Sequence, residues 1–263
     1  VIDTDATNND GTINFSSTIN GTKHLDLVSG SAAIAIQGTI GGSVTLASLD
    51  INQSAETGTI EISDIGDSDT YGVTGVTRIG NANTATLTLD GTTYKTDGAT
   101  TYTTATGNKI NLTGSSPTFT TNNDSIIFAT GNVTIGDGTL TVNSNNGNIT
   151  FGGSILGSNG ADEKLVLNAG SGVVSVAAIG SGNKIHTVTL TGSGGITLNG
   201  DITTSDIANN NVSFTGGVTL GENVVIDTDA TNNDGTINFS STINGTKHLD
   251  LVSGSAAIAI QGT

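Results

Sequence analysis

Short stretches of alternating apolar and polar residues recur along the whole chain. Segments such as "TINF", "HLDLV", "AAIAI" and "TATLTL" alternate over three to six positions and then stop at Gly, Asn, Asp or Ser. Alternation places apolar side chains on one face of an extended strand, and the residues that follow favour turns. The pattern therefore predicts many short β-strands separated by turns.

Helices are not expected. The chain is dominated by Thr, Ser, Asn, Gly, Val and Ile, which suit strands and turns, and it is poor in helix formers. Of its 23 acidic residues 19 are Asp, a turn former, and only four are Glu. The expected fold class is all-β.

The spacing of phenylalanines distinguishes two all-β architectures, a sandwich of hairpins and a parallel β-helix. Phe128 and Phe151 are 23 residues apart, and a similar interval separates Phe214 from Phe239. That interval suits one coil of a parallel β-helix, in which like side chains of successive coils stack in the interior. We therefore expect a β-solenoid of about ten coils, on the order of 50 Å long, with Asn runs such as "NSNNGN" at its corners.

The chain repeats itself. Residues 1–39 recur without a change as residues 225–263, so every residue number rises by 224 between the copies. A weaker repeat aligns 125–155 with 211–243, so that Phe128 matches Phe214. We interpret the chain as a window cut from a longer tandem array, and we expect Ile to follow Thr263, as Ile40 follows Thr39.

One segment departs from the repeats. Residues 67–107 have no counterpart in the weaker repeat and contain all three tyrosines and the only arginine. We expect this segment to form an inserted hairpin or small β lobe between solenoid coils at 1–66 and 108–263, although two irregular coils remain an alternative. Exposed Tyr and Arg are enriched in recognition hot spots. The candidate recognition residues are Tyr71, Arg78, Tyr94 and Tyr102.

Charge and composition exclude several classes of protein. The net charge of −16, with seven Lys and Arg, argues against binding to nucleic acid or to anionic lipid. No stretch approaches the roughly 20 apolar residues of a membrane helix. The absence of cysteine excludes disulfides, zinc thiolates and thiol nucleophiles.

Two groups of aspartates are candidates for calcium binding: Asp3, Asp5 and Asp10, and Asp64, Asp67 and Asp69. An EF-hand loop needs oxygen ligands at alternate positions leading into its glycine. Counting back from Gly11 gives Asp10, Asn8 and then Ala6, so one ligand is missing. We interpret both groups as turns, with calcium kept open, and we expect no other cofactor.

Catalysis is not expected either. Several polysaccharide lyases are β-helices, but such chemistry needs carboxylates, a cation and a basic residue to abstract a proton. Basic residues are thinly spread here, and His24 and His248 are copies of one position. Alternation in "KHLDL" turns His24 outward. We expect no enzyme.

The phrases "GNITFGGSILGSNGADEKLVLNAGSGVVSVAAIG" and "GGITLNGDITT" resemble the repeats of filamentous-haemagglutinin-like proteins. More closely, they are similar to the giant β-strand-repeat surface proteins of Gram-negative bacteria. The likeness covers most of 107–263 and 1–66. It implies a secreted, right-handed parallel β-helix used as a cell-surface stalk, adhesin or filament, with no catalytic residues.

The expected function is therefore a structural extracellular fibre or stalk of tandem repeats at the cell surface, which mediates attachment or contact between cells. Its expected partners are neighbouring repeats of the same polypeptide or identical chains, and surface glycans. The alternative is an adhesin module that binds a glycan or a protein through 67–107.

Overall fold

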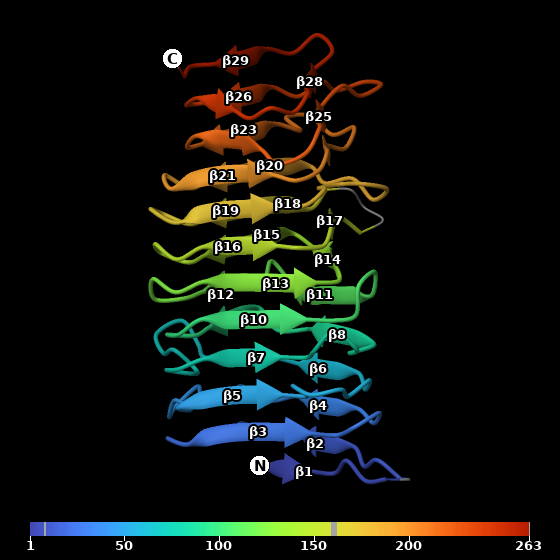
Figure 1. Ribbon diagram of the computed structural model, residues 1–263, viewed down its shortest axis with the longest axis vertical. Coiled ribbons are helices and arrows are strands. Elements are labelled where there is room, and N and C mark those ends of the chain that lie inside the picture. Colours follow the sequence, from blue (N-terminus) through green and yellow to red (C-terminus); the bar gives the residue numbers. More distant parts are fainter. Residues whose placement is uncertain (8, 159–161, 263) are drawn as a thin grey trace.

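The chain winds into a tall stack of coils, with the N-terminal coil at one end and the C-terminal coil at the other (Figure 1). The computed structural model describes residues 1–7, 9–158 and 162–262. Asn8, which entered the calcium-loop count, residues 159–161 of the resemblance phrase and Thr263 of the second copy lie outside that range. All regular elements of the described chain are strands, and their pairings are parallel throughout, from β1 on β3 to β26 on β29. The predicted all-β parallel solenoid is confirmed.

Each coil contributes to three faces. The first face is an 11-stranded sheet. Its strands are β1 (Ile2–Asp3), β3 (His24–Val28), β5 (Ser48–Ile51), β7 (Thr77–Ile79), β10 (Thr100–Thr103), β13 (Ile126–Thr130), β16 (Ile149–Phe151), β19 (Val173–Val176), β21 (Gly195–Leu198), β24 (Val218–Leu220) and β27 (Ile243–Asn244).

The second face consists of a seven-stranded and a three-stranded sheet, which isolated bridges join through Ile155, Ile179 and Ile202. Its strands are β2 (Ile13–Phe15), β4 (Ile34–Ile36), β6 (Ile60–Ile62), β8 (Thr86–Leu89), β11 (Lys109–Ser115), β14 (Asn132–Asp137), β17 (Ile155–Leu156), β22 (Ile202–Thr203), β25 (Val224–Asp227) and β28 (Leu249–Val252).

The third face is an eight-stranded sheet that bridges through Ile19, Ile40, Ile65 and Tyr94 extend towards the N-terminal end. Its strands are β9 (Thr93–Lys95), β12 (Thr118–Thr120), β15 (Thr139–Asn143), β18 (Lys164–Asn168), β20 (Thr187–Thr191), β23 (Val212–Thr215), β26 (Ile237–Phe239) and β29 (Ile258–Ile260).

Alternation within each short strand builds the core. In β4, Ile34 and Ile36 point inward and are buried, whereas Ala35 between them is only partly covered. The parallel register sets each inward residue on the inward residue of the next coil, as Ile34 lies on Ile60. A single coil cannot bury its own apolar side chains, but the stack encloses one continuous apolar core.

The phenylalanine interval marks one coil, as predicted. Phe128 and Phe151 are register partners on the first face, and their ring centroids lie 4.4 Å apart in a stacked arrangement. Phe214 and Phe239 are register partners on the third face, with centroids 4.7 Å apart. Interior stacking of like residues is therefore confirmed.

Asparagines occupy corners that require left-handed backbone. Among the residues that the structure describes, five non-glycine residues have positive φ, and four of them are asparagines: Asn52, Asn123, Asn145 and Asn209. Asparagine tolerates this conformation better than other residues with a Cβ atom. At one corner the Asn146 side-chain amide donates to Asn123 Oδ1 of the preceding coil at 2.6 Å.

The prediction of an inserted lobe at 67–107 is wrong. Strand β7 lies between β5 and β10, β8 lies between β6 and β11, and β9 pairs with β12, so this segment completes coils within the stack. The irregular-coil alternative describes it. The coil is long, since the register partners Asp50 and Arg78 are 28 residues apart, and two of the tyrosines fill the interior.

Candidate functional site

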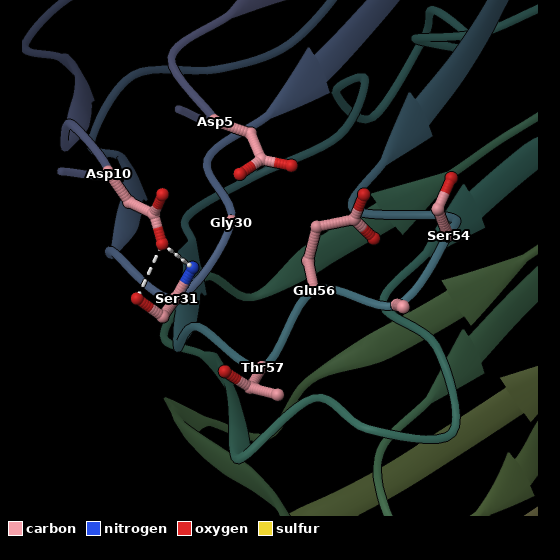
Figure 2. Close-up of a pocket in the computed structure, with 8 residues that line it drawn as sticks. Asp5, Asp10, Gly30, Ser31, Ser54, Glu56 and Thr57 are labelled. Carbon is pink, nitrogen blue, oxygen red and sulfur yellow. Dashed lines mark hydrogen bonds between the residues drawn. The ribbon is translucent and has the colours of Figure 1, made fainter. Parts of the chain in front are cut away.

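The notch that best qualifies as a candidate site lies at the N-terminal end of the solenoid (Figure 2). Three consecutive coils form it: the loop after β1 supplies Asp5 and Asp10, the turn after β3 supplies Gly30 and Ser31, and the loop before β6 supplies Glu56. Three carboxylates in one shallow notch are the chemistry of a cation site, and the partners of each carboxylate decide whether it is free to bind one.

The Asp10 carboxylate forms hydrogen bonds that join two neighbouring coils. Its Oδ2 accepts hydrogen bonds from the Ser31 amide at 2.7 Å and from Ser31 Oγ at 2.5 Å. Its Oδ1 accepts from the Ala6 amide at 3.2 Å. These hydrogen bonds lower the pKa of Asp10 below its ordinary value, and the bonds from Ser31 have the largest effect. We call the Asp10–Ser31 contact the aspartate clip.

Asp5 and Glu56 border the notch from different coils (Figure 2). Burial raises the pKa of Asp5, and the negative charges of Asp10, Asp3 and Glu56 raise it further. Glu56 is 7% exposed, and its Oε2 accepts from Asn81 Nδ2 at 3.3 Å. The Glu56 carboxylate therefore also has a partner within the fold.

Within the described ranges, no three His, Cys, Asp or Glu side chains are placed to hold one metal ion. The second copy repeats the clip, since Asp234 Oδ2 accepts from the Ser255 amide and hydroxyl at 2.6 Å each. A separate notch beside this copy is lined by Lys184, Asp206 and Asp229. The clip therefore belongs to the repeat, and calcium binding stays a prediction.

In the second aspartate group, Asp64 joins two coils and Asp67 holds a turn. Asp64 Oδ1 accepts from the Thr92 and Thr93 amides, both at 2.8 Å, and so ties two coils together. Asp67 Oδ1 accepts from the Asp69 amide at 2.8 Å and the Thr70 amide at 2.6 Å. These backbone bonds lower the pKa of Asp67.

The structure separates the four predicted recognition residues. Tyr94 and Tyr102 are each 1% exposed and lie in the core. Tyr94 stacks on Phe119 with centroids 4.5 Å apart, and Tyr102 stacks on Phe128 at 5.0 Å. Burial raises the pKa of both phenols. A partner cannot reach these two rings in the folded chain.

Tyr71 and Arg78 stay at the surface. The ammonium group of Lys95 lies 4.9 Å from the centroid of the half-buried Tyr71 ring. The Arg78 side chain is 53% exposed, with a guanidinium nitrogen 3.5 Å from Asp50 Oδ2. His24 is also turned outward, as predicted, and its Nδ1 lies 2.7 Å from Ser48 Oγ. Arg78 and His24 therefore lie on the outer surface of the first face, and Tyr71 lies beside Lys95 of the third face.

Comparison with known proteins gives no family. A scan against protein-family models and searches of curated proteins and of solved structures all found no match. In the described ranges no helix is long and apolar enough to cross a membrane. The solenoid and its repeat are therefore the grounds on which a function can be proposed.

Proposed function

We propose that this chain is a structural segment of an extracellular fibre or stalk, built from tandem 224-residue units and serving attachment at a cell surface. Backbone N–H and C=O groups of each coil pair with the coils on either side of it, along the long axis of the stack. Strand pairing at about 4.8 Å per coil makes such a stack stiff along its length. The proposal gives the chain a mechanical role.

The observation that carries the proposal is that both copies of the 39-residue sequence build the same two coils. In each copy a threonine hydroxyl, Thr4 or Thr228, donates to a glycine carbonyl seven residues later at 2.5 Å. The aspartate clip is also present in both. A sequence that forms the same two coils wherever it occurs supports a fibre that grows by adding units.

The scarcity of unpaired strand edges along the sides of the solenoid also supports a fibre. Most strands lie between two others, so unpaired strand edges are concentrated at the two ends of the stack. Unpaired edges are the usual sites of uncontrolled association. A stack of this kind extends along one axis without aggregating sideways.

The mass of the native polypeptide tests the tandem fibre. We expect a chain far larger than 26.1 kDa, which limited proteolysis cuts into fragments that differ by one 224-residue unit, and antibodies against the chain should label intact source cells. A discrete native chain of 26.1 kDa would contradict the tandem array. Labelling that requires broken cells would contradict the surface location.

The second candidate function is recognition of a glycan or a protein through Tyr71 and Arg78. Their exposure supports it, because both residue types are enriched in binding hot spots. Deleting 67–107 would remove paired strands and is not a usable test. Tyr71→Ala and Arg78→Ala keep the coils, so loss of adhesion with unchanged fibre length would favour recognition, and unchanged adhesion would contradict it.

A further inference from the structure

The identical copies do not lie on the same faces of the solenoid. Following register partners up the first face from Ile2 leads through nine coils to Leu220. The copy of Ile2 is not Leu220 but Ile226, six residues further along the chain. Those six residues carry the chain to the next face, where Ile226 pairs with Ile202.

Every element of the repeat is displaced in the same direction. Strands β1 and β3 lie on the first face, and their copies β25 and β28 lie on the second. Strands β2 and β4 lie on the second face, and their copies β26 and β29 lie on the third. Ile19 bridges on the third face, and its copy Ile243 begins β27 on the first.

We infer that one repeat unit spans nine and a third coils, so that each unit presents its surface one face further round than the unit before it. Three units return to the starting face. We infer also that the partner of each end of this stack is the neighbouring unit, in the register that the other copy already shows. Both inferences rest on the proposed tandem fibre.

At the C-terminal end, the second copy lacks contacts that the first copy makes. Ile34 and Ile36 are 1% and 0% exposed under β6, whereas their copies Ile258 and Ile260 are 42% and 53% exposed. In the first copy the covering strands are β5 on β3 and β6 on β4. The same strands of a following unit fit on β28 and β29.

At the N-terminal end, the first copy lacks contacts that the second copy makes. Ile2 is 41% exposed, whereas its copy Ile226 is fully buried on β22. Phe15 is only partly buried, whereas its copy Phe239 is fully buried on Phe214 of β23. Residues of a preceding unit equivalent to β22 and β23 therefore fit beneath β1 and β2.

Local hydrogen bonds explain why the same sequence can start on either face. The Thr4 amide donates to the Val28 carbonyl at 2.8 Å, and the Thr228 amide donates to the Val252 carbonyl at the same distance. Together with the aspartate clip, these bonds join the two coils of a copy to each other. The copy needs only inward apolar neighbours above and below, which all three faces supply.

Disulfide trapping in the 263-residue chain tests the change of face, since the native chain has no cysteine to interfere. Ser213 and Asn238 are outward register partners on the third face, at a separation a disulfide can bridge. We expect Ser213→Cys with Asn238→Cys to oxidise fully. A disulfide instead in the control pair, Thr203→Cys with Asn238→Cys, would place the copy on the second face and overturn the inference.

Thiol accessibility tests the end contacts. We expect the thiol of Ile260→Cys to react readily in the 263-residue chain and at least tenfold more slowly in a chain extended by residues 40–263. Ile36→Cys is the matched control, because it has the same local sequence and is covered in both chains. Equal reactivity of the Ile260→Cys thiol in the two chains would overturn the junction.

The extended chain should also be longer by nine and a third coils, about 45 Å at ~4.8 Å per coil, which small-angle X-ray scattering measures. These outcomes are separate from the proposed function. A native chain of only one unit would end the fibre proposal while leaving the trapped disulfide intact. A tandem native protein with the control disulfide would keep the fibre and end the inference about faces.

Discussion

At the residue scale, the aspartate clip requires a glycine beside it. Gly30 has φ of +61° and its copy Gly254 has φ of +54°, a left-handed conformation that side chains disfavour. A Cβ atom on Gly30 would also lie 2.6 Å from the carboxyl carbon of Asp10, and one on Gly254 would lie 2.5 Å from that of Asp234. The conformation and the close approach occur together in both copies.

Gly30→Ala should therefore destabilise the N-terminal coils by about 1–2 kcal/mol, from left-handed strain and displacement of the clip. Urea unfolding of the single and double variants measures this. Gly254→Ala should have a similar effect at the other end, and the two losses should add because the sites are far apart. Gly107→Ala is the matched control for backbone strain alone, since it has φ of +81° with open space around its Cβ position. An equal loss for all three would remove the clip from the explanation.

The buried tyrosines differ in their hydrogen bonds. Tyr94 Oη accepts from the Gly91 amide at 2.9 Å and donates to the Ile62 carbonyl at 3.2 Å. Tyr94→Phe should therefore cost about 1–2 kcal/mol in the free energy of unfolding. Tyr102→Phe is the control, because the hydrogen bonds found in the described chain include none from its hydroxyl, and it should cost less than ~0.5 kcal/mol. The reverse order would contradict this assignment.

The aspartates predict how stability depends on pH. Hydrogen bonds lower the pKa of Asp10, Asp67, Asp206 and Asp234 from the ordinary 3.8. Their contribution to stability is present above pH 3.8 and is lost as the pH falls through the lowered values. The melting temperature should therefore fall steadily as the pH drops below about 4.

Asp5 and its copy Asp229 have the opposite effect on the pH dependence of stability. Burial, and then nearby carboxylates, raise the pKa of both above 3.8, so their contribution is lost as the pH rises through the raised values. The melting temperature should pass through a maximum just above about pH 4. Asp5→Asn with Asp229→Asn should flatten only the high-pH side of that maximum, and an unchanged profile would contradict the assignment.

At the element scale, the middle of the core holds a run of packed aromatic rings. Phe119 lies 5.3 Å from Phe128, and Phe128 lies 4.4 Å from Phe151, with Tyr94 and Tyr102 on the preceding coil. These rings come from the first and third faces and meet between them. Sheet pairing and ring packing together hold the coils around 94–151.

Phe128→Ala should cost about 3–5 kcal/mol, because the cavity would have packed rings on several sides. Thermal and urea unfolding, monitored by circular dichroism, measure the loss. Ile127→Ala on the same strand is the matched control, since that side chain faces outward and should cost less than ~1 kcal/mol. Similar losses for the two variants would contradict the inward and outward assignment of β13.

The sequence predicted the strands and their inward residues better than it predicted how the strands group into coils. Alternation identified the inward residues, and the interval between Phe128 and Phe151 identified the coil. The same alternation in "TTYK" and "TTYT" places Tyr94 and Tyr102 inward, but the general preference of Tyr for interfaces suggested exposure. Coil length varies, and the long coil that contains Arg78 obscured the period in the segment that was misassigned.

The candidate site was only partly predictable for a physical reason. The sequence interpreted both aspartate groups as turns, and in the structure Asp3 and Asp67 each accept from the backbone amide two residues along the chain, while calcium binding stays a prediction. The partners of Asp10 and Glu56 could not be found, since Ser31 and Asn81 lie 21 and 25 residues away in the sequence. Such contacts between coils depend on the length of every corner in between.

At the scale of the whole molecule, the solenoid should behave as a sum of coils. Deleting 126–148 removes one coil and joins Ser125 to Ile149, the register partner of Ile126. Phe151 would then take the place of Phe128 beneath the aromatic run. Since each coil contacts only its neighbours, we expect a folded chain about 5 Å shorter, with a cooperative unfolding transition retained. Small-angle scattering and circular dichroism test both.

Deleting 126–137 is the control, because it removes two faces of a coil and leaves the third, so later strands meet the wrong partners. We expect that variant to lose cooperative unfolding. Equal tolerance of the two deletions would mean that register between faces is not specified.

The direction of the backbone pairing decides how such a stack responds to tension. Its hydrogen bonds run along the axis, so a pull on the two ends opens them one after another rather than shearing a whole strand at once. Each coil that opens, such as the one from Leu27 to Ile51, replaces ~4.8 Å of folded length with roughly 80 Å of extended chain. A tether of this design would yield coil by coil under a sudden load, lengthen many times over before its ends parted, and rewind when the load fell.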